Sequence, residues 1–514
     1  MDDESLADRA VHPRPGRDGD DRIRRGARSG ARMTGSGAAP GAGWRRRCSR
    51  ALPGVLLLAL CAGCTGGAGA RGADGGSGAG AGGAGVGDAL FPRLGNGGYD
   101  VRGYRLALDY APGSRHLRGT ARITARADRP LRSFHLDLAG LRVRKASVNG
   151  RPAEVTRSGT ELVLTPASAL PGGRTFTATV GYDGTPKTLT GGDTGKEGWI
   201  RTHDGAVALG EPTGSMTWFP GNHHPSDKAA YDIAVTVPQG YTAVSNGELK
   251  GQETRGRRTT FRWHSGEPMA SYLATVAIGR FAVRTTTTGE GLPAYLAVDP
   301  TEAAAAKGLA ERVDDVIAWE SRTFGPYPFS STGAIVGHVP GLGYALETQT
   351  KPFFDAAPDQ TLIVHELAHQ WFGDSVTPRL WKDIWLNEGF ATYAEWLWEE
   401  DHGGRTAQRI FDDFHDGTDE ESEGIWDFPP ADPPSAASVS DPPVYGRGAM
   451  VLHQVRRAVG DTAFFTVLRT WLKDHRHGNA DTKQFIELCE RISGRDLTRL
   501  FDVWLYGEGK PKRP

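Results

Sequence analysis

Apolar and polar residues alternate with a period of two over residues 99–284 of this 514-residue chain. The run 104–110 shows the pattern clearly, because every second position in it is Tyr or Leu. Turn-forming pairs such as Asn246-Gly247 separate the runs. Successive side chains of a β-strand point to opposite faces, so the alternation predicts short strands with one buried face. We therefore expect an antiparallel β domain over residues 95–290.

Helical spacing of apolar residues replaces the alternation after one further predicted strand at 292–298. The second domain, expected over residues 291–514, is therefore mostly α with a small strand portion. Asp481 is a suitable N-cap and Gly494 a suitable C-terminal stop for one of its helices. The predicted fold class is multidomain α+β. Helices are expected at residues 303–324, 361–373, 386–398, 447–472, 482–492 and 497–505.

Net charge and cysteine content restrict the classes of function. The net charge is -1 at pH 7, so no overall field favours nucleic acid, and we expect no nucleic-acid partner. Of the four cysteines, only Cys489 lies in the predicted folded domains, where a small core residue is the simplest interpretation. A disulfide framework and a cysteine metal cluster are therefore excluded.

The N-terminal leader, residues 1–64, is expected to be disordered and to end in a secretory signal. Basic residues precede an apolar stretch of about a dozen residues, as in export signals. The sequence at 61–64 then resembles a bacterial lipobox, in which Cys64 is lipidated and becomes the mature N-terminus. Simple secretion and an uncleaved anchor are the alternatives. Because the signal lies far from Met1, Met33 is the better start for it.

Residues 65–94 begin as a run of nearly pure Gly, Ala and Ser and predict a flexible tether. With Cys64 lipidated, the tether would connect the folded domains to a membrane. We therefore expect an exported protein that is lipid-anchored to the outer face of the cytoplasmic membrane, with the membrane as a partner through Cys64. Without the lipid, the expected location is outside the cell as a secreted protein.

The segment 365–369 reads His-Glu-Leu-Ala-His inside a predicted helix. Helix positions four apart lie on one face, so His365 and His369 can bind one Zn²⁺ with their imidazoles. Glu366 lies next to this metal position, where a carboxylate can take a proton from the attacking water. The alternative is two helix histidines beside a solvated glutamate, which the five-residue motif alone does not exclude.

A third candidate ligand weighs against that alternative. Glu388 follows His369 by 19 residues and lies at the start of the next predicted helix. A catalytic zinc ion needs three protein ligands and an open fourth position, and Glu388 completes the three for one zinc per chain. Asp374 and Glu395 are candidate partners for the other ring nitrogens of the histidines. Three further histidines are expected to be structural: His223, His224 and His338.

The stretch 365–396 resembles the gluzincin aminopeptidases, the family of aminopeptidase N and leukotriene hydrolase. Its two-histidine helix, the gap and the glutamate ligand match that family's signature, and the resemblance extends over about residues 95–514. It implies a saddle-like N-terminal β domain followed by a thermolysin-like catalytic zinc domain. The larger relatives continue with a long helical C-terminal domain, so we expect a more open cleft here.

The resemblance also implies two residues that bind the substrate's free amine. Residues 344–348 occupy the place of the family's Gly-Ala-Met-Glu-Asn loop, so Glu347 is expected to pair with the amine, with Ala345 and Leu346 beside it. Glu211 lies eight residues before a Phe-Pro pair, as the family's second amine-binding residue does. The alternative for Glu211 is a carboxylate in a turn.

Tyr445 stands in a segment that resembles the family's Tyr-x-Lys-Gly-Ala. The resemblance implies that its hydroxyl donates a hydrogen bond to the tetrahedral oxyanion, opposite the zinc. The alternative is a tyrosine packed at an interface.

Together these residues predict a zinc-dependent metallopeptidase, in the first place an aminopeptidase that releases N-terminal residues from peptides outside the cytoplasm. Peptides with free N-termini are the expected partners, because an internal peptide bond carries no charge for Glu347 and Glu211 to bind. The alternatives are an endopeptidase or a non-peptidase hydrolase on the same scaffold, or a catalytically silent surface binding protein.

Overall fold

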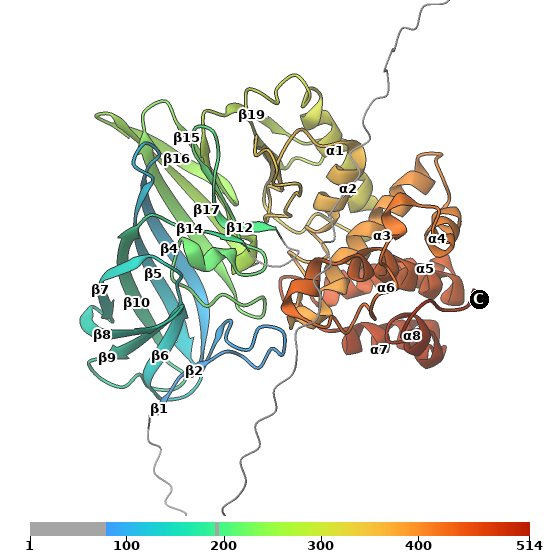
Figure 1. Cartoon of the computed structure of the whole chain (residues 1–514), viewed down its shortest axis with the longest axis horizontal. Helices are drawn as coiled ribbons and strands as arrows, with labels where there is room; N and C mark the ends of the chain where they lie inside the picture. The colour runs from blue at the N-terminus through green and yellow to red at the C-terminus, as the bar shows by residue number, and fades with distance from the viewer. Residues whose placement is uncertain (1–78, 191–194, 514) are drawn as a thin grey trace, which may run out of the picture. The chain divides into compact units, whose positions relative to one another are not determined.

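An 11-stranded sheet forms most of the N-terminal half in the computed structural model, which describes residues 79–190 and 195–513 (Figure 1). Its neighbouring strands are mostly antiparallel, as expected, but two pairs are parallel, β14 with β4 and β1 with β6. In order across the sheet, the strands are β1 (Gly80–Ala81), β6 (Leu131–Asp137), β9 (Glu161–Pro166), β8 (Arg151–Ser158), β7 (Arg142–Val148), β10 (Thr175–Gly184), β5 (His116–Ala127), β4 (Tyr99–Ala111), β14 (Lys228–Pro238), β17 (Arg258–Ala270) and β16 (Glu248–Arg255).

The alternating sequence pattern corresponds to one covered and one open face of this sheet. In β4, Leu106, Leu108 and Tyr110 are buried, while Arg105 and Asp109 between them are exposed. The apolar face is buried because removing it from water is favourable in proportion to its area. The period-two prediction is therefore confirmed at the level of single side chains.

A five-stranded sheet covers the apolar face of the large one. The rings of Tyr110 and Trp199 meet between the two sheets with centroids 5.0 Å apart. The indole of Trp263 in turn donates a hydrogen bond to the carbonyl of Ala243 at 3.0 Å. The strands of the small sheet are β11 (Thr188–Thr190), β12 (Lys196–Arg201), β13 (Ala206–Leu209), β18 (Val276–Gly279) and β15 (Thr242–Ser245).

The second half begins with a four-stranded sheet, β19 (Ala282–Thr287), β20 (Pro293–Val298), β21 (Thr332–Val336) and β22 (Phe353–Phe354). The predicted domain boundary at 290/291 separates β19 from its antiparallel partner β20. By strand pairing, β19 therefore belongs with the second half, although it lies within the range predicted for the first. Two short pairs complete the strands: β2 (Gly83–Ala84) with β3 (Asn96–Gly97), and β23 (Thr377–Pro378) with β24 (Asn479–Ala480).

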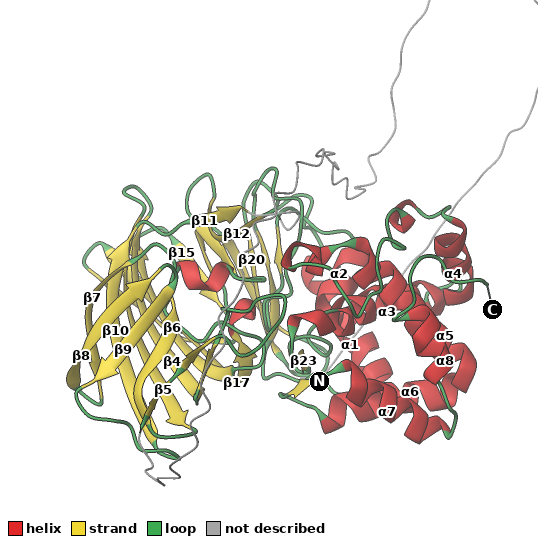
Figure 2. Ribbon diagram, turned by 60° about the horizontal axis from the view of Figure 1, so that its bottom comes forward, coloured by secondary structure: helices red, strands yellow, loops and turns green. Residues whose placement is uncertain are grey.

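Helices make up the rest of the second half (Figure 2). Asp481 caps its helix with a complete capping box, and Gly494 ends it with φ 66°, as predicted. The helices are α1 (Leu309–Phe324), α2 (Gln360–Ala368), α3 (Trp385–Asp401), α4 (Ala407–Asp416), α5 (Gly448–Val459), α6 (Asp461–Asp474), α7 (Thr482–Ser493) and α8 (Thr498–Trp504).

The helices differ from the predictions in four places, the first being that the helix expected at 361–373 ends at Ala368. The single helix expected at 447–472 is two helices, α5 and α6, because Gly460 between them has φ +84°, outside the helical region. Helix α1 begins at Leu309 instead of residue 303, after a series of turns. Helix α4 was not predicted, although Thr406 caps its first turn and its buried residues follow helical spacing.

The predicted tether at 65–94 is wrong for its described part, which packs against the folded domains. The Asp88 carboxylate is 2% exposed and accepts a hydrogen bond from the backbone N–H of Trp381 at 2.8 Å. It also lies 3.2 Å from Nε2 of His224, so this histidine is structural, as expected. These bonds attach residues 80–94 to the catalytic half, which a Gly-rich composition does not reveal.

The predicted leader and the lipidation candidate Cys64 lie outside the described residues. Within the described ranges, none of the helices combines the length and the apolar character needed to cross a membrane. All described residues belong to one compact unit.

Candidate active site

Helices α2 and α3 bring the three predicted zinc ligands together. Asp359 caps α2 by accepting from the N–H of Leu362 at 2.9 Å, His365 lies on the last turn of this helix, and His369 is its C-cap residue. Oε2 of Glu388, from the first turn of α3, lies 3.3 Å from Nε2 of His365 and 3.4 Å from Nε2 of His369. The sequence spacing therefore corresponds to one compact donor set in space.

The remaining nitrogen of each histidine is held by a partner, which fixes the direction of the ring. Nδ1 of His365 lies 2.5 Å from Oε1 of Glu395, as one of the two predicted partners. Nδ1 of His369 faces the carbonyl oxygen of Phe372 at 3.0 Å. The other predicted partner, Asp374, is therefore not the residue that orients His369. With both Nδ1 atoms engaged, both Nε2 atoms are directed at Glu388.

The electrostatics of this cluster suit a dication. Burial raises the pKa of the Glu388 carboxyl, but the nearby His369 and His365 outweigh it and bring the pKa to about 2. Burial lowers the pKa of His365, yet its hydrogen bonds to Glu388 and Glu395 raise it well above the usual value. The site thus attracts positive charge. Two imidazoles and a carboxylate with ligand atoms all within 4.8 Å of one another fit Zn²⁺.

Glu366 is placed as a buried base beside the cluster. Its side chain is 4% exposed, and its Oε2 has no hydrogen-bond partner among the described residues. Burial raises its pKa to about 8, although His365 and His369 act in the opposite direction. A carboxylate that is nearly dry and unpaired can take up a proton readily.

Two further carboxylates converge on the zinc ligand Glu388. Carboxylate oxygens of Glu211, Glu347 and Glu388 all lie within 4.8 Å of one another. Burial raises the pKa of Glu211 well above its usual value, and the charges of Glu347 and Glu388 raise it further. Oε1 of Glu347, in a side chain 2% exposed, has no hydrogen-bond partner among the described residues. A small cation would neutralise this group of like charges.

The segment that carries Glu347 runs along β22 as an extended edge. Leu346 exchanges two backbone hydrogen bonds of 2.8 Å with Phe353, the first residue of β22. Leu346 and Ala345, the substrate-binding residues predicted beside Glu347, are both buried. Their alignment with the sheet fixes the direction of the Glu347 side chain relative to α2.

Gln370, which sequence reasoning missed, connects this segment to the zinc helix. Its side-chain oxygen accepts from the backbone N–H of Thr350 at 2.7 Å, and its amide donates to the carbonyl of Glu347 at 3.3 Å. Gln370 directly follows the two-histidine motif, so its position next to His369 was the available signal. The amide therefore couples the predicted amine-binding segment to the predicted metal ligands.

Asn246 holds the same segment from the N-terminal half. Its amide donates to the carbonyl of Gln349 at 2.9 Å, while the N–H of Gly247 donates to Oγ1 of Thr350 at 2.7 Å. The side chain of Lys351 contacts the carbonyl of Gly247 as well. In the sequence, Asn246-Gly247 indicated only a turn, because the local sequence of a turn does not reveal which distant segment the turn contacts.

Tyr445 reaches the site from a π-helical turn, Pro443–Arg447. Its ring stacks on the ring of His365 with centroids 6.1 Å apart and an interplanar angle of 17°. The structure therefore brings Tyr445 to the predicted zinc ligands, as the resemblance implied. Arg447 of the same turn is fully buried and donates to backbone carbonyls at the C-terminal end of α8, including that of Trp504 at 2.9 Å.

Two glycines allow the Tyr445 turn to approach α3. A Cβ atom on Gly389 would lie 2.9 Å from the carbonyl carbon of Gly448, closer than non-bonded atoms approach. We expect Gly389→Ala to reduce the free energy of unfolding by about 1–3 kcal/mol, because backbone must shift to admit the methyl group. Urea unfolding of the variant measures this. Gly251→Ala, where a Cβ meets nothing within 4 Å, is the control and should leave stability nearly unchanged.

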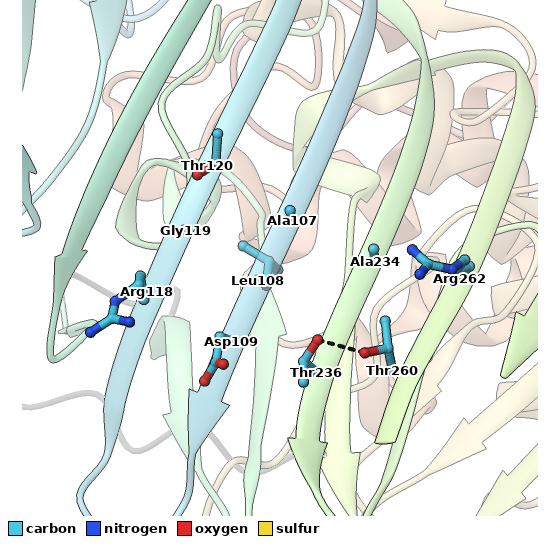
Figure 3. A pocket seen from close by; sticks show the side chains of 10 residues that line it. All are labelled: Ala107, Leu108, Asp109, Arg118, Gly119, Thr120, Ala234, Thr236, Thr260 and Arg262. Carbon is cyan, nitrogen blue, oxygen red and sulfur yellow. Dashed lines mark hydrogen bonds between the residues drawn. The ribbon is translucent and has the colours of Figure 1, made fainter. Parts of the chain in front are cut away.

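Grooves on the outer face of the 11-stranded sheet contain none of the predicted site residues. One of about 280 Å³ has a floor of small side chains from β4, β5 and β14, flanked by Arg118 and Arg262 (Figure 3). Oγ1 of Thr236 and Oγ1 of Thr260 hydrogen-bond beside it at 2.8 Å. Its lining residues include no histidine, cysteine or glutamate, so the chemistry of the chain lies at the α2–α3 cluster.

Two family descriptions match the two halves of the chain. The Peptidase M1 N-terminal domain matches residues 101–273, and the Peptidase family M1 domain matches residues 346–504. Glutamyl aminopeptidase of Bos taurus is 29% identical over 329 residues, which cover 59% of this chain and 34% of that protein. The Tricorn protease-interacting factor F2 of Thermoplasma volcanium is 27% identical over 323 residues, covering 59% of this chain and 40% of that protein. The chain thus spans well under half the length of these curated relatives.

A solved structure matches almost from end to end. An M1 zinc metallopeptidase from Deinococcus radiodurans, crystallised as a mutant with a Tyr-Ser-Ala substrate, is 30% identical with a TM-score of 0.76. The match covers 84% of this chain and 99% of that one. It confirms the predicted fold class, an N-terminal β domain followed by a helical catalytic domain. With both halves matched and a relative at this identity covered nearly completely, the chain belongs to peptidase family M1.

Proposed function

We propose that the chain is a zinc-dependent aminopeptidase that removes N-terminal residues from peptides. The observation that carries the proposal is the position of Glu211 and Glu347, whose carboxylate oxygens lie within 4.8 Å of an oxygen of Glu388. A cationic amine bound there is held beside the metal ligands. Only the first peptide bond of a substrate is then close enough to react.

The residues around the metal position divide the chemistry among them. Zinc bound by His365, His369 and Glu388 would supply a Lewis acid that polarises the scissile carbonyl and makes water more acidic. Glu366 takes a proton from the attacking water and passes it to the leaving amine. The hydroxyl of Tyr445 donates a hydrogen bond to the developing oxyanion.

Charge accounts for the preference for a free N-terminus. Burial raises the pKa of both Glu211 and Glu347, and the charge of Glu388 raises both further, so an ammonium group that pairs with them relieves an unfavourable arrangement. An acetylated amine or an internal peptide bond leaves the carboxylates unpaired in a nearly dry site. Such substrates therefore bind weakly for two reasons. They form no ion pair with the two glutamates, and they leave two buried carboxylates without a counter-charge.

Hydrolysis of a panel of aminoacyl fluorogenic amides, with and without a zinc chelator, tests the proposed function. We expect cleavage that the chelator abolishes and that requires a free amine. Equal cleavage of N-acetylated substrates would favour an endopeptidase. A folded, zinc-loaded protein that cleaves neither class would contradict the peptidase assignment and favour a binding role.

Replacing Glu347 with Gln should lower kcat/KM for free aminoacyl amides by about 10²-fold, mainly through a higher KM. Gln keeps the shape of the side chain but cannot pair with the ammonium as a carboxylate does. Rates on free and N-acetylated substrates measure the selectivity, which should fall together with kcat/KM. Glu154→Gln, at an exposed position of β8, is the matched control and should change neither. Unchanged selectivity in Glu347→Gln would remove this residue from amine binding.

A further inference from the structure

A second group of metal-binding side chains lies at the junction of the two halves. His203 and Asp204 occupy the turn between β12 and β13, and Asp299 directly follows β20. One ligand atom from each of the three lies within 4.8 Å of the others. Nδ1 of His203 is 3.6 Å from Oδ2 of Asp299, and its Nε2 is 3.9 Å from Oδ1 of Asp204.

The imidazole of His338 lies beside this group of three. Strands β20 and β21 are parallel neighbours with Val298 opposite Val336. Asp299 and His338 therefore both leave the sheet at its carboxyl edge, where ligands bind in open α/β sheets. The rings of His338 and His203 have centroids 6.3 Å apart. We call these four residues the junction site: His203, Asp204, Asp299 and His338.

His338 is oriented in the way that metal-binding histidines are. Its Nδ1 lies 2.7 Å from Oε1 of Glu302, whose other oxygen accepts from the N–H of Ala357 at 3.1 Å. Nδ1 of His365 faces Oε1 of Glu395 in the same manner at the predicted catalytic zinc. A carboxylate on one ring nitrogen fixes the tautomer and makes the other nitrogen the better ligand.

The two aspartates are held in a similar way, each by one oxygen. Oδ1 of Asp299 accepts from the N–H of Thr301 at 2.9 Å and from its hydroxyl at 2.7 Å. Oδ2 of Asp204 accepts from the N–H of Arg280 at 2.8 Å. The other oxygen of each aspartate faces His203. The hydrogen bonds to Thr301 and Arg280 therefore fix the direction of the carboxylate oxygens that could bind a metal ion.

The charge of the junction site calls for a cation. Asp299 is 5% exposed, and across residues 79–190 and 195–513 the ion pairs of Asp204 and Asp299 are with His203 only. No lysine or arginine side chain of the described chain compensates either carboxylate. A buried carboxylate without a full counter-charge is costly, and a bound dication would remove that cost.

We propose that the junction site binds a divalent transition-metal ion of the Zn²⁺ class, in addition to the ion held by the α2–α3 cluster. One imidazole and two carboxylates are a donor set that Zn²⁺ accepts, whereas Mg²⁺ and Ca²⁺ prefer sites made of oxygen atoms alone. The inference does not depend on the proposed peptidase function, because it uses none of the residues assigned to catalysis.

An ion here would connect the two segments that carry the amine-binding candidates. The turn with His203 and Asp204 leads through β13 to Glu211. His338 begins the segment that leads to Glu347. Bound metal would thus hold the β domain and the catalytic domain together at the side from which both glutamates approach.

The test is zinc binding to the purified, chelator-stripped protein, measured as bound metal per chain after equilibrium dialysis and by the shift of the melting temperature. We expect two equivalents for the natural chain, the second raising the melting temperature. His203→Ala should bind one equivalent and lose that second shift. The side chain of His203 is 49% exposed, so this variant is expected to fold.

Two controls distinguish the junction site from other zinc binding. His116→Ala removes a histidine of similar exposure, 43%, that also lies near an aspartate, and should keep both equivalents. Glu388→Ala should lose the zinc ion of the α2–α3 cluster and keep the zinc ion of the junction site. An error in the catalytic assignment can therefore be distinguished from an error in the junction assignment. A single equivalent in the natural chain, or two in both His203→Ala and Asp299→Asn, overturns the proposal. A melting shift with Ca²⁺ but not Zn²⁺ overturns the ion class.

Discussion

Replacing Glu366 with Gln will lower kcat on aminoacyl amides by about 10³-fold while the zinc content stays unchanged. Glu366 is the buried carboxylate beside the metal ligands, with a pKa raised by burial to about 8 and one oxygen without a partner among the described residues. Gln has the same shape but cannot take a proton from water. Steady-state kinetics together with metal analysis of the same preparation measure both quantities.

The matched control for this substitution is Glu487→Gln, an exposed position on α7 with a side chain 61% exposed, which should keep full activity. If Glu366→Gln retained most of its activity with zinc bound, another group would have to serve as the base. If the variant lost zinc, Glu366 would instead be acting on the metal site itself.

Replacing Tyr445 with Phe is expected to lower kcat by about 10²- to 10³-fold and to leave KM within a few-fold of the natural value. The aromatic ring, which stacks on His365 with centroids 6.1 Å apart, is kept in this variant. Only the hydroxyl is lost, and its hydrogen bond to the oxyanion exists in the transition state but not in the bound substrate. Separate values of kcat and KM are therefore the appropriate measurement.

A second tyrosine provides the control for that variant. Tyr506 is 45% exposed and lies near the C-terminal end of α8, so Tyr506→Phe should leave both constants unchanged. An increase in KM alone for Tyr445→Phe would show that the residue binds substrate without stabilising the oxyanion. Unchanged kinetics would identify Tyr445 as a packing residue, the alternative left open by its sequence.

The zinc ligands were predictable because their signal is local. His365 and His369 are one helical turn apart, and the α-helix itself places them on a common face. Glu388 follows within the next helix, so its approach required only that α2 and α3 pack together. Glu395, two further turns along α3, was predictable as a partner of His365 for the same reason.

Predictions failed where distant segments decide the local structure. Residues 80–94 have the composition of a tether, but Asp88 is bonded to Trp381, which lies 293 positions later. Strand β19 lies within the range predicted for the N-terminal domain but pairs with β20 of the other half. Hydrophobic periodicity shows which side of an element is buried, and it does not show which element covers that side.

The sequence by itself determined the order of the two domains, the strand and helix content of each, and the residues of one candidate zinc site, because periodicity and motif spacing act over a few residues. Only the tertiary structure decided that Glu211 and Glu347 meet beside Glu388. It alone also decided that the turn with His203 lies against the ends of β20 and β21. Such contacts join positions more than 90 residues apart, and the same local pattern is compatible with many long-range pairings until packing selects one of them.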